Sequence, residues 1–376
     1  MRSSRTTAVR LAALTLAISA LCFSRSPRAV TESLPGQLTD RAFWSMSTGF
    51  SEPGGYFRSD NLVSNETAFQ HVIPTLLRHN GSAGAYLGVG PDQNFTYIVA
   101  LHPRVAFIVD IRRENLLLHL MYKAVIEQSP TRVDFVSRLF SRRRPAGVGP
   151  SSTAAELFDA LDRAPADQRL YDRNLKDIVH QLVNRHGFKL SPDDVRGIDY
   201  VYRAFFSSGP GIAYSFPRGG WARFPTYREL MSETDGNGMQ RSYLATEANY
   251  RVLREYERSN LIVPVVGDFA GPRALRAVGA YLRDHGTSVE AFYTSNVEQY
   301  LFRGTEWQEF YANVASLPID GESTFIRASF MNSGYWYPSS TSAFPSATLL
   351  NPIATLLDAV NDGRIRGYED VIGISK

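Results

Sequence analysis

The spacing of apolar residues changes repeatedly early in the chain, and each change predicts an element. Residues 85–87 form a short apolar run typical of a strand, and a glycine-containing turn follows at 88–92. Residues 94–101 then carry apolar side chains at helical spacing. A continuous apolar run at 105–109 is typical of a strand buried in a parallel sheet, and it ends in Asp110. This segment therefore predicts a strand, a turn, a helix and a second strand.

The remaining chain divides into a helical middle and a region where strands and helices alternate. A long helix is expected over 114–128, and residues 129–259 show almost only helical and loop patterns. Further strands are predicted at 261–266, 289–293, 324–329 and 371–374, and further helices at 272–285, 297–302 and 351–361. This alternation predicts an α/β fold with a parallel sheet, helices on both faces, and a large helical insertion at 129–259 between the second and third strands. We expect the insertion to pack over the carboxyl edge of the sheet.

The amino-acid composition of the chain limits the kinds of function that we expect. The 376 residues are 44% hydrophobic, which is enough for one large domain with an insertion. The net charge of +3 is small and the arginines are spread among acids, so nucleic acid is not an expected partner. With one cysteine, Cys22, neither an intramolecular disulfide nor a cysteine zinc site is available, and the histidines lack metal-ligand spacing. We therefore expect no bound metal.

The N-terminal residues have the pattern of an export signal. Arg2, Arg5 and Arg10 precede an uncharged apolar run at 11–23, which has the length of a signal-peptide core and is short for a membrane span. We therefore expect a signal peptide at 1–24, a linker at 25–40 and one domain over 41–376. The mature protein would be periplasmic or extracellular, with no stable transmembrane span.

The predicted turn after the first strand carries the residues of a ligand site. In sheets of this kind ligands bind at the carboxyl ends of the strands, where glycines let the backbone approach the ligand. Gly88 and Gly90 lie in that turn, and Asp110 closes the second strand about 20 residues later, where an acid accepts hydrogen bonds from ribose hydroxyls. This spacing predicts a small-molecule, nucleoside-type ligand. A plain tight turn with a capping aspartate is the alternative interpretation.

With these motifs the chain resembles the class I S-adenosylmethionine-dependent methyltransferases, which have a Rossmann-like fold. The resemblance is carried by YLGVGPD at 86–92, by Asp110 and by the step Gly267-Asp268 after the third strand. It also extends to a group of exported bacterial proteins of unknown function. The resemblance implies a methyltransferase-type sheet and S-adenosylmethionine as cofactor, held by Gly88, Gly90, Asp92, Asp110 and Asp268, with Asp268 near the adenine.

Two positions depart from the superfamily pattern. Tyr86 stands where the superfamily usually has an acid, and Asp92 stands where it usually has a third glycine. Both departures concern the methionine end of the ligand. An NAD-dependent dehydrogenase is the rival interpretation, but Gln93 occupies the position of its third glycine. A P-loop is excluded because no lysine follows the glycines.

No catalytic residue can be assigned from the sequence. Ser295-Asn296 follows a predicted strand where methyltransferases acting on nitrogen often carry a catalytic motif, but an asparagine that caps the next helix is the simpler interpretation. Two hypotheses remain: a methyltransferase-like enzyme with an unknown substrate, and an exported, non-catalytic binding or interaction protein that retains the fold.

The export signal generates the first testable prediction. Intact-mass measurement on protein from the native host should give a mature chain that starts between about residue 21 and residue 30, because signal peptidase cleaves after the apolar core. A full-length cytoplasmic species would contradict export and would favour the enzyme.

Overall fold

Six strands form one sheet in the computed structural model, which describes residues 33–79, 84–214, 224–330 and 346–376. The predicted signal peptide and the first half of the predicted linker lie outside the described residues. The strands are β1 (Ala85–Gly88), β2 (Val105–Asp110), β3 (Ile262–Val266), β4 (Val289–Ser295), β5 (Thr324–Phe330) and β6 (Ser346–Pro352).

The sheet is mixed and mostly parallel, in the order β3-β2-β1-β4-β5-β6. All neighbours pair in parallel except β5 and β6, which are antiparallel. Every residue of β1, β2 and β3 is buried, which explains their continuous apolar runs, since a strand covered on both faces has no solvent side. The chain runs outward from β1 to β3 and then returns to build the other half from β4, so the strand order reverses between β1 and β4.

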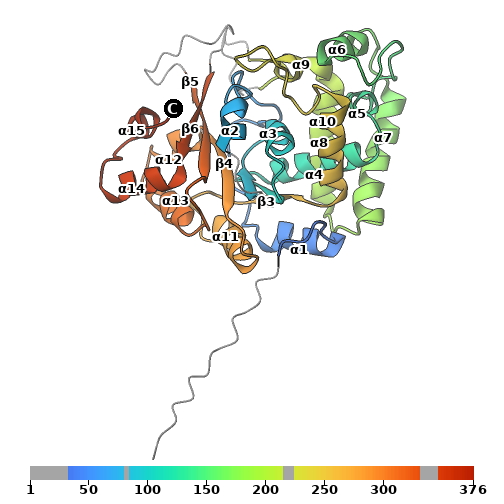
Figure 1. The fold of residues 1–376 in the computed structure, drawn as a ribbon. Helices are drawn as coiled ribbons and strands as arrows, with labels where there is room; N and C mark the ends of the chain where they lie inside the picture. Colours follow the sequence, from blue (N-terminus) through green and yellow to red (C-terminus); the bar gives the residue numbers. More distant parts are fainter. Residues whose placement is uncertain (1–32, 80–83, 215–223, 331–345) are drawn as a thin grey trace, which may run out of the picture. The chain divides into compact units, whose positions relative to one another are not determined.

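Helices flank the sheet on both sides. Figure 1 shows α4, α8 and α10 on one side and α12, α13 and α14 on the other. The α-helices that the structure describes are α1 (Asp40–Gly49), α2 (Ile73–His79), α3 (Gln93–Leu101), α4 (Arg113–Glu127), α5 (Arg132–Leu139), α6 (Ala154–Asp162), α7 (Gln168–His180), α8 (Pro192–Ser208), α9 (Tyr227–Ser232), α10 (Glu247–Arg258), α11 (Ala274–Asp284), α12 (Val297–Leu301), α13 (Glu306–Ala315), α14 (Ile353–Asn361) and α15 (Tyr368–Gly373). Two short helical turns add to these, a π-helix at Gln181–Arg185 and a 3-10 helix at Gly209–Gly211.

The outer edge of β3 is closed by the N-terminal helix. The Ser47 hydroxyl at the end of α1 donates to the carbonyl of Pro264, and the amide of Val266 donates to Ser51 Oγ. These bonds satisfy backbone groups that an edge strand would otherwise leave free. Pro264 is tolerated in β3 because an edge strand needs fewer backbone donors than a central one.

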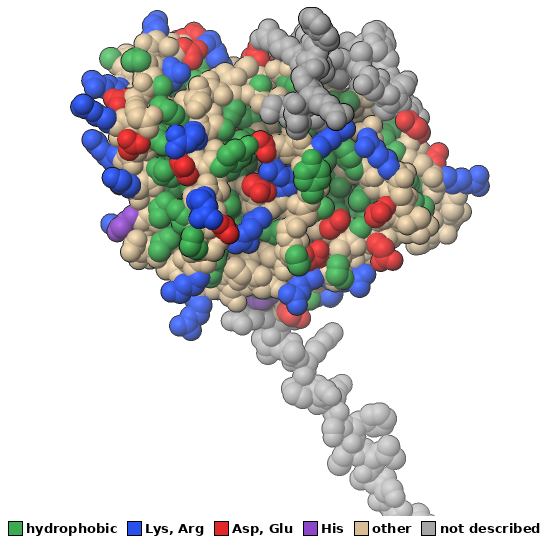
Figure 2. Space-filling view, turned by 180° about the vertical axis from the view of Figure 1, so that it is seen from behind, with side chains coloured by type: hydrophobic (Ala, Val, Ile, Leu, Met, Phe, Trp, Pro, Cys, Tyr) green, Lys and Arg blue, Asp and Glu red, His purple; other side chains and the backbone are tan. Residues whose placement is uncertain are grey.

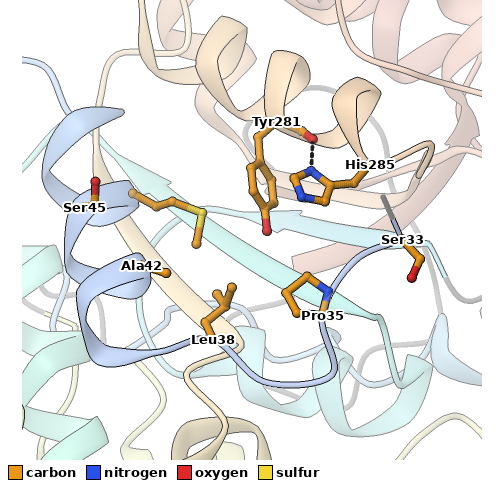
Figure 3. A pocket seen from close by; sticks show the side chains of 8 residues that line it. Ser33, Pro35, Leu38, Ala42, Ser45, Tyr281 and His285 are labelled. Atoms are coloured by element: carbon orange, nitrogen blue, oxygen red, sulfur yellow. Dashed lines mark hydrogen bonds between the residues drawn. The ribbon is translucent and has the colours of Figure 1, made fainter. Parts of the chain in front are cut away.

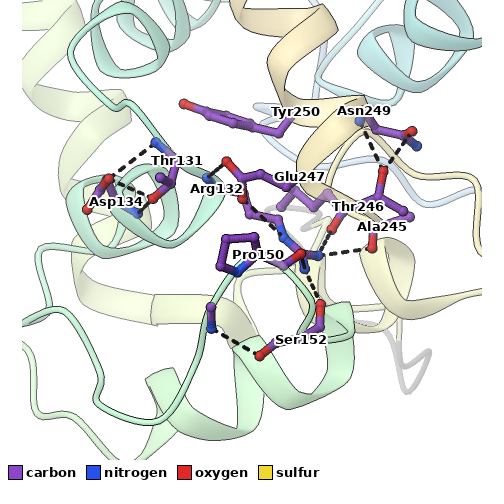
Figure 4. A network of polar contacts seen from close by, with 12 residues as sticks. Thr131, Arg132, Asp134, Pro150, Ser152, Ala245, Thr246, Glu247, Asn249 and Tyr250 are labelled. Carbon is purple, nitrogen blue, oxygen red and sulfur yellow. Dashed lines mark hydrogen bonds and ion pairs between the residues drawn. The ribbon is translucent and has the colours of Figure 1, made fainter.

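Between β2 and β3 the structure contains helices and no strand among the described residues. One buried arginine ties this region together, as Figure 4 shows: Arg132 donates to the carbonyls of Leu244, Ala245, Pro150 and Ser152 and pairs with Glu247. Because one guanidinium has five donors in a fixed plane, it can connect several chain segments at once. The start of α5, the loop before α6 and the start of α10 are thereby joined.

Some local predictions are wrong. Residues 371–374 were predicted as a strand but belong largely to α15, where Asp370 Oδ2 accepts the amides of Arg366 and Gly367 and caps the first turn. The strand beside β5 is instead β6, which the sequence did not reveal. At the end of the described chain, Lys376 exchanges two backbone hydrogen bonds with Leu350 of β6.

Among the described residues, no helix combines the length and the apolar character needed to cross a membrane.

A prediction about stability follows from one fully buried ion pair. Glu298 of α12 and Arg327 of β5 have no exposed side-chain surface, and Arg327 Nε and Nη2 both donate to the carboxylate. Glu298→Gln should lower the free energy of unfolding by about 3 to 5 kcal/mol, because it leaves a buried guanidinium without its counter-charge. Urea unfolding followed by circular dichroism measures this.

The control is Arg364→Ala, which removes an exposed pair with Asp362 and should change stability by about 1 kcal/mol or less. Adding Arg327→Met to Glu298→Gln should recover part of the loss. Equal effects of Glu298→Gln and Arg364→Ala would show that the buried pair contributes no more than a surface pair.

Candidate functional site

The glycine turn after β1 is closed by the chain's own side chains. A Cβ at Gly88 would lie 2.0 Å from Asn94 Oδ1, and Asn94 Nδ2 donates to the carbonyls of Val89 and Pro91. Glycine is therefore required at 88 so that the Asn94 amide can fold back over the turn. At Gly90 the requirement is conformational, since its φ of +79° is strained for other residues.

Asp110 lies directly beside this turn. Its Oδ1 accepts the amide of Arg112 at 2.9 Å, and the Gly90 backbone also hydrogen-bonds to the carboxyl group. Burial raises the pKa of Asp110 to about 6, and these backbone bonds oppose the rise. The structure thus brings Gly88, Gly90 and Asp110 together at the carboxyl edge.

The segment before α2 crosses above this edge. The Arg112 guanidinium donates to the carbonyls of Ser59 and Asp60 and pairs with the Asp60 carboxylate. Asn61 Nδ2 would lie 3.2 Å from a Cβ at Gly90. The chain at 59–61 therefore covers the place where Gly90 and Asp110 meet.

Asp92 faces the insertion. It is buried, and its Oδ2 accepts the Tyr243 hydroxyl at 2.9 Å, while Tyr243 and Tyr227 share a further hydroxyl contact of 2.5 Å. Burial raises the pKa of Asp92 to about 7, with the Tyr243 bond opposing the rise. Asp92 thus connects the insertion to the end of β1. It lies two residues after Gly90 in the sequence but has different hydrogen-bond partners.

Asp268 follows β3 and is partly exposed. Its Oδ1 accepts the amide of Ala270, and the amide of Gly267 donates to the Asp110 carbonyl, so the two acids end neighbouring strands. Glu52 Oε1 accepts the amides of Arg273 and Ala274 at the start of α11. A carboxylate of the chain itself therefore occupies this helix N-terminus.

A second polar cluster, not predicted from the sequence as a unit, lies at the carboxyl end of β4. The Tyr293 hydroxyl donates to Glu66 Oε1 at 2.5 Å and accepts from Gln93 Nε2 at 2.8 Å, and the Ser295 hydroxyl also donates to Glu66 Oε1 at 2.5 Å. Burial raises the pKa of Glu66 to about 7, and the bonds from Ser295 and Tyr293 oppose the rise. We call Glu66, Gln93, Tyr293 and Ser295 the β4 cluster.

The backbone at Ser295 is unusual. Its φ is +52°, and the register between β4 and β5 shifts between Tyr293 and Ser295. Non-glycine residues adopt this conformation at an energetic cost, and such residues concentrate at functional sites. Ser295-Asn296 was the one signal in the sequence that pointed to this end of β4. Nothing in the sequence pointed to Glu66.

A polar side chain of α4 contacts the glycine turn. His119 Nε2 lies 2.9 Å from the Gly90 carbonyl, and burial lowers the pKa of His119 to about 4, so the ring is neutral and donates this bond. His119 Nδ1 and both amide atoms of Asn115 are buried and have no hydrogen-bond partner in the described structure. Buried polar groups without partners are rare in native proteins, so their gathering here marks an unusual site.

A surface cavity of about 390 Å³ lies elsewhere, between α1 and the C-terminal end of α11 (Figure 3). Its lining includes Leu38, Met46, Tyr281 and His285, and none of the predicted site residues. A helix that precedes a parallel strand ends near the start of that strand, so this cavity lies toward the amino edge. Ligands of open α/β sheets bind at the opposite edge.

Within the described ranges no group of histidine, cysteine and acidic side chains is arranged to hold a metal ion. Figure 2 shows acidic and basic side chains interspersed over much of the face seen from behind.

The burial of Glu66 predicts a pH-dependent stability difference. A carboxyl group whose pKa rises from 4.5 in the unfolded chain to about 7 in the fold binds its proton more tightly when folded, so its contribution to stability is complete below pH 4.5 and is lost as the pH rises through 7. Glu66→Gln cannot ionise. Relative to wild type, this variant should gain on the order of 3 kcal/mol of unfolding free energy between about pH 4 and pH 8.

Denaturant unfolding at several pH values measures this difference. Glu322→Gln, which changes an exposed glutamate, is the matched control and should track the wild type. A difference for Glu66→Gln that does not vary with pH would mean that Glu66 is solvated.

Comparison with protein families identifies the family of the chain. A family model described as a domain of unknown function, DUF7790, matches residues 61–148 and 151–357. These ranges include Glu66, the glycine turn, Asp110, Asp268 and Ser295. No curated protein matches the chain. Since the model covers most of the sequence, the protein belongs to the DUF7790 family.

Proposed function

We propose that the protein binds a nucleoside-type ligand at the carboxyl ends of β1, β2 and β4, as a methyltransferase-like protein with S-adenosylmethionine as cofactor. The observation that carries the proposal is the reversal of strand order between β1 and β4, with Gly90 and Asp110 beside it. Open α/β sheets bind ligands at such a reversal. The order β3-β2-β1-β4-β5 also supports a Rossmann-like arrangement, with β6 as an antiparallel addition.

The residues at the end of β2 fit the nucleoside part of this cofactor. Asp110 is a carboxylate at a strand end, and Gly90 presents backbone without a side chain. In this proposal Asp110 accepts hydrogen bonds from the ribose hydroxyls, and Asp268, at the end of the next strand, lies toward the adenine. When bound, S-adenosylmethionine supplies an electrophilic methyl group.

The fit is weaker at the methionine end. The Tyr86 hydroxyl, at the position of the superfamily's acid, donates to Asn94 Oδ1, and the Asn94 amide fills the space at Gly88. Asp92 is engaged by Tyr243. Neither departure from the superfamily pattern supplies an acceptor for the amino-acid portion of the cofactor, so its partners have to come from another part of the chain.

These same contacts favour a second candidate function, an exported binding or interaction protein without catalysis. Asn94 over the turn and Glu52 on the start of α11 are groups of the chain that occupy positions which a ligand of an active enzyme would use. The basic and apolar pattern of residues 1–24 points in the same direction, since it predicts export from the compartment where the cofactor is made.

Calorimetric titration with S-adenosylmethionine, S-adenosylhomocysteine and NAD tests the proposal. Asp110→Ala should weaken binding of the two adenosyl ligands by roughly 10- to 150-fold, because a hydrogen bond to a charged group contributes about 1.5 to 3 kcal/mol. Gly90→Val should abolish binding, since it combines steric exclusion with a strained φ. Asp268→Ala should have a smaller effect.

Exposed Asp284 provides the control variant Asp284→Ala, which should bind like the wild type. Thermal unfolding of each variant separates loss of ligand contact from loss of fold. Wild-type binding of NAD alone would favour a dehydrogenase, and no binding of any nucleoside by the wild type would leave the non-catalytic protein as the better account.

A further inference from the structure

Two buried oxygen atoms of the β4 cluster have no hydrogen-bond partner in the described structure: Glu66 Oε2 and Gln93 Oε1. The Glu66 and Gln93 side chains are 1% and 3% exposed. Both are anchored to the same atom, Tyr293 Oη, through their other polar atoms. The two free acceptors therefore belong to side chains held on either side of one hydroxyl group.

No cationic side chain among the described residues pairs with the Glu66 carboxylate. No ion pair among the described residues includes Glu66. Four tyrosines interact electrostatically with it: Tyr86 of β1, Tyr97 of α3, Tyr293 of β4 and Tyr368 of α15. Burial raises the pKa of each tyrosine, so all four are neutral and add no positive charge.

Two other buried acids have counter-charges within the fold, whereas Asp92 accepts from the neutral Tyr243 hydroxyl. Glu298 is paired with Arg327, and Glu127 lies 2.7 Å from the Lys123 ammonium. A buried acceptor without a partner costs free energy that a well-placed donor would recover. The contrast with these pairs indicates that the partner of Glu66 is not a side chain of the described structure.

The location of the cluster connects it to the surface and to the strand reversal. Gln93 begins α3 directly after the β1 turn, whereas Tyr293 and Ser295 end β4, so the cluster spans the point where the strand order reverses. Ser295 is partly exposed and has a positive φ. Of the four residues of the cluster, Ser295 is the one that is not buried.

We propose that Glu66 Oε2 and Gln93 Oε1 bind a protonated amine of a ligand, with Tyr293 and Ser295 holding the carboxylate in place. An ammonium group has three donors and no acceptor, which suits two unpartnered oxygens, one of them charged. The inference rests on the proposed function for its placement beside the nucleoside site. The amine has two possible sources: the amino-acid portion of the nucleoside ligand, or a separate amine substrate.

Binding of an amine at Glu66 should release protons from the protein. The pKa of Glu66 is raised to about 7 by burial, so near pH 6 much of it is protonated in the free protein. An ammonium ion beside it favours the carboxylate and lowers that pKa, so binding releases protons. A purely structural glutamate would give no such release.

Calorimetry on the full chain at pH 6, in two buffers of different ionisation enthalpy, tests the inference. The probes are S-adenosylhomocysteine, which carries an amine, 5′-methylthioadenosine, which lacks the amino-acid portion, and ethanolamine. Glu66→Gln should weaken binding of the amine-bearing probe by roughly 10- to 100-fold and abolish proton release. Binding of 5′-methylthioadenosine should be unchanged. Gln93→Leu is the second variant, and Glu322→Gln is the control.

Loss confined to S-adenosylhomocysteine places the amine in the nucleoside ligand, and loss confined to ethanolamine identifies a separate amine substrate. Ethanolamine binding that needs Glu66, without binding of any nucleoside, would support the amine site while the proposed function fails. Conversely, 5′-methylthioadenosine binding with no Glu66-dependent amine binding would overturn the amine site and leave the proposed function standing. Absence of amine binding to the wild type also overturns it.

Discussion

Burial of both faces of the parallel sheet is the constraint on which the rest of the structure depends. Because β1, β2 and β3 have no solvent side, polar side chains on this half of the sheet are confined to strand ends and to the loops that follow. Asp110 and Ser295 are the last residues of β2 and β4, Asp92 follows β1, and Glu66 contacts the carboxyl end of β4. The polar side chains described above are therefore concentrated at one edge of the sheet.

Covering the carboxyl edge of the sheet raises the pKa values of the acidic side chains there. The chain at 59–66 and the insertion both pack onto it, through Arg112 on one side and Tyr243 on the other. Glu66, Asp92 and Asp110 are consequently desolvated, and the pKa of each is raised. The pKa values of these three carboxyl groups are thus brought toward neutral pH, where small changes in their surroundings alter their protonation.

The insertion is part of this arrangement. Asp92 accepts from Tyr243, and Gln70, just before α2, bonds to the carbonyls of Leu230 and Glu233 and to the amide of Arg241. These contacts tie the helical region to the carboxyl edge at several points. The contacts of Arg132 join segments within that region (Figure 4). Movement of the insertion would therefore alter the solvation of Asp92 and the shape of the edge next to Gly90.

The sequence by itself determined the order of most elements and the position of the glycine turn and Asp110, because apolar spacing and turn residues act locally. It did not reveal β6, and it misassigned 371–374, because a short apolar run fits either a strand or one buried helical turn until its pairing partner is known. Only the tertiary structure decided that Asn94 fills the space at Gly88 and that Asp92 faces Tyr243. The β4 cluster joins Glu66 to Tyr293 across 227 positions of the chain. Such a contact depends on which strands become neighbours, and strand order is a property of the whole sheet rather than of any local segment.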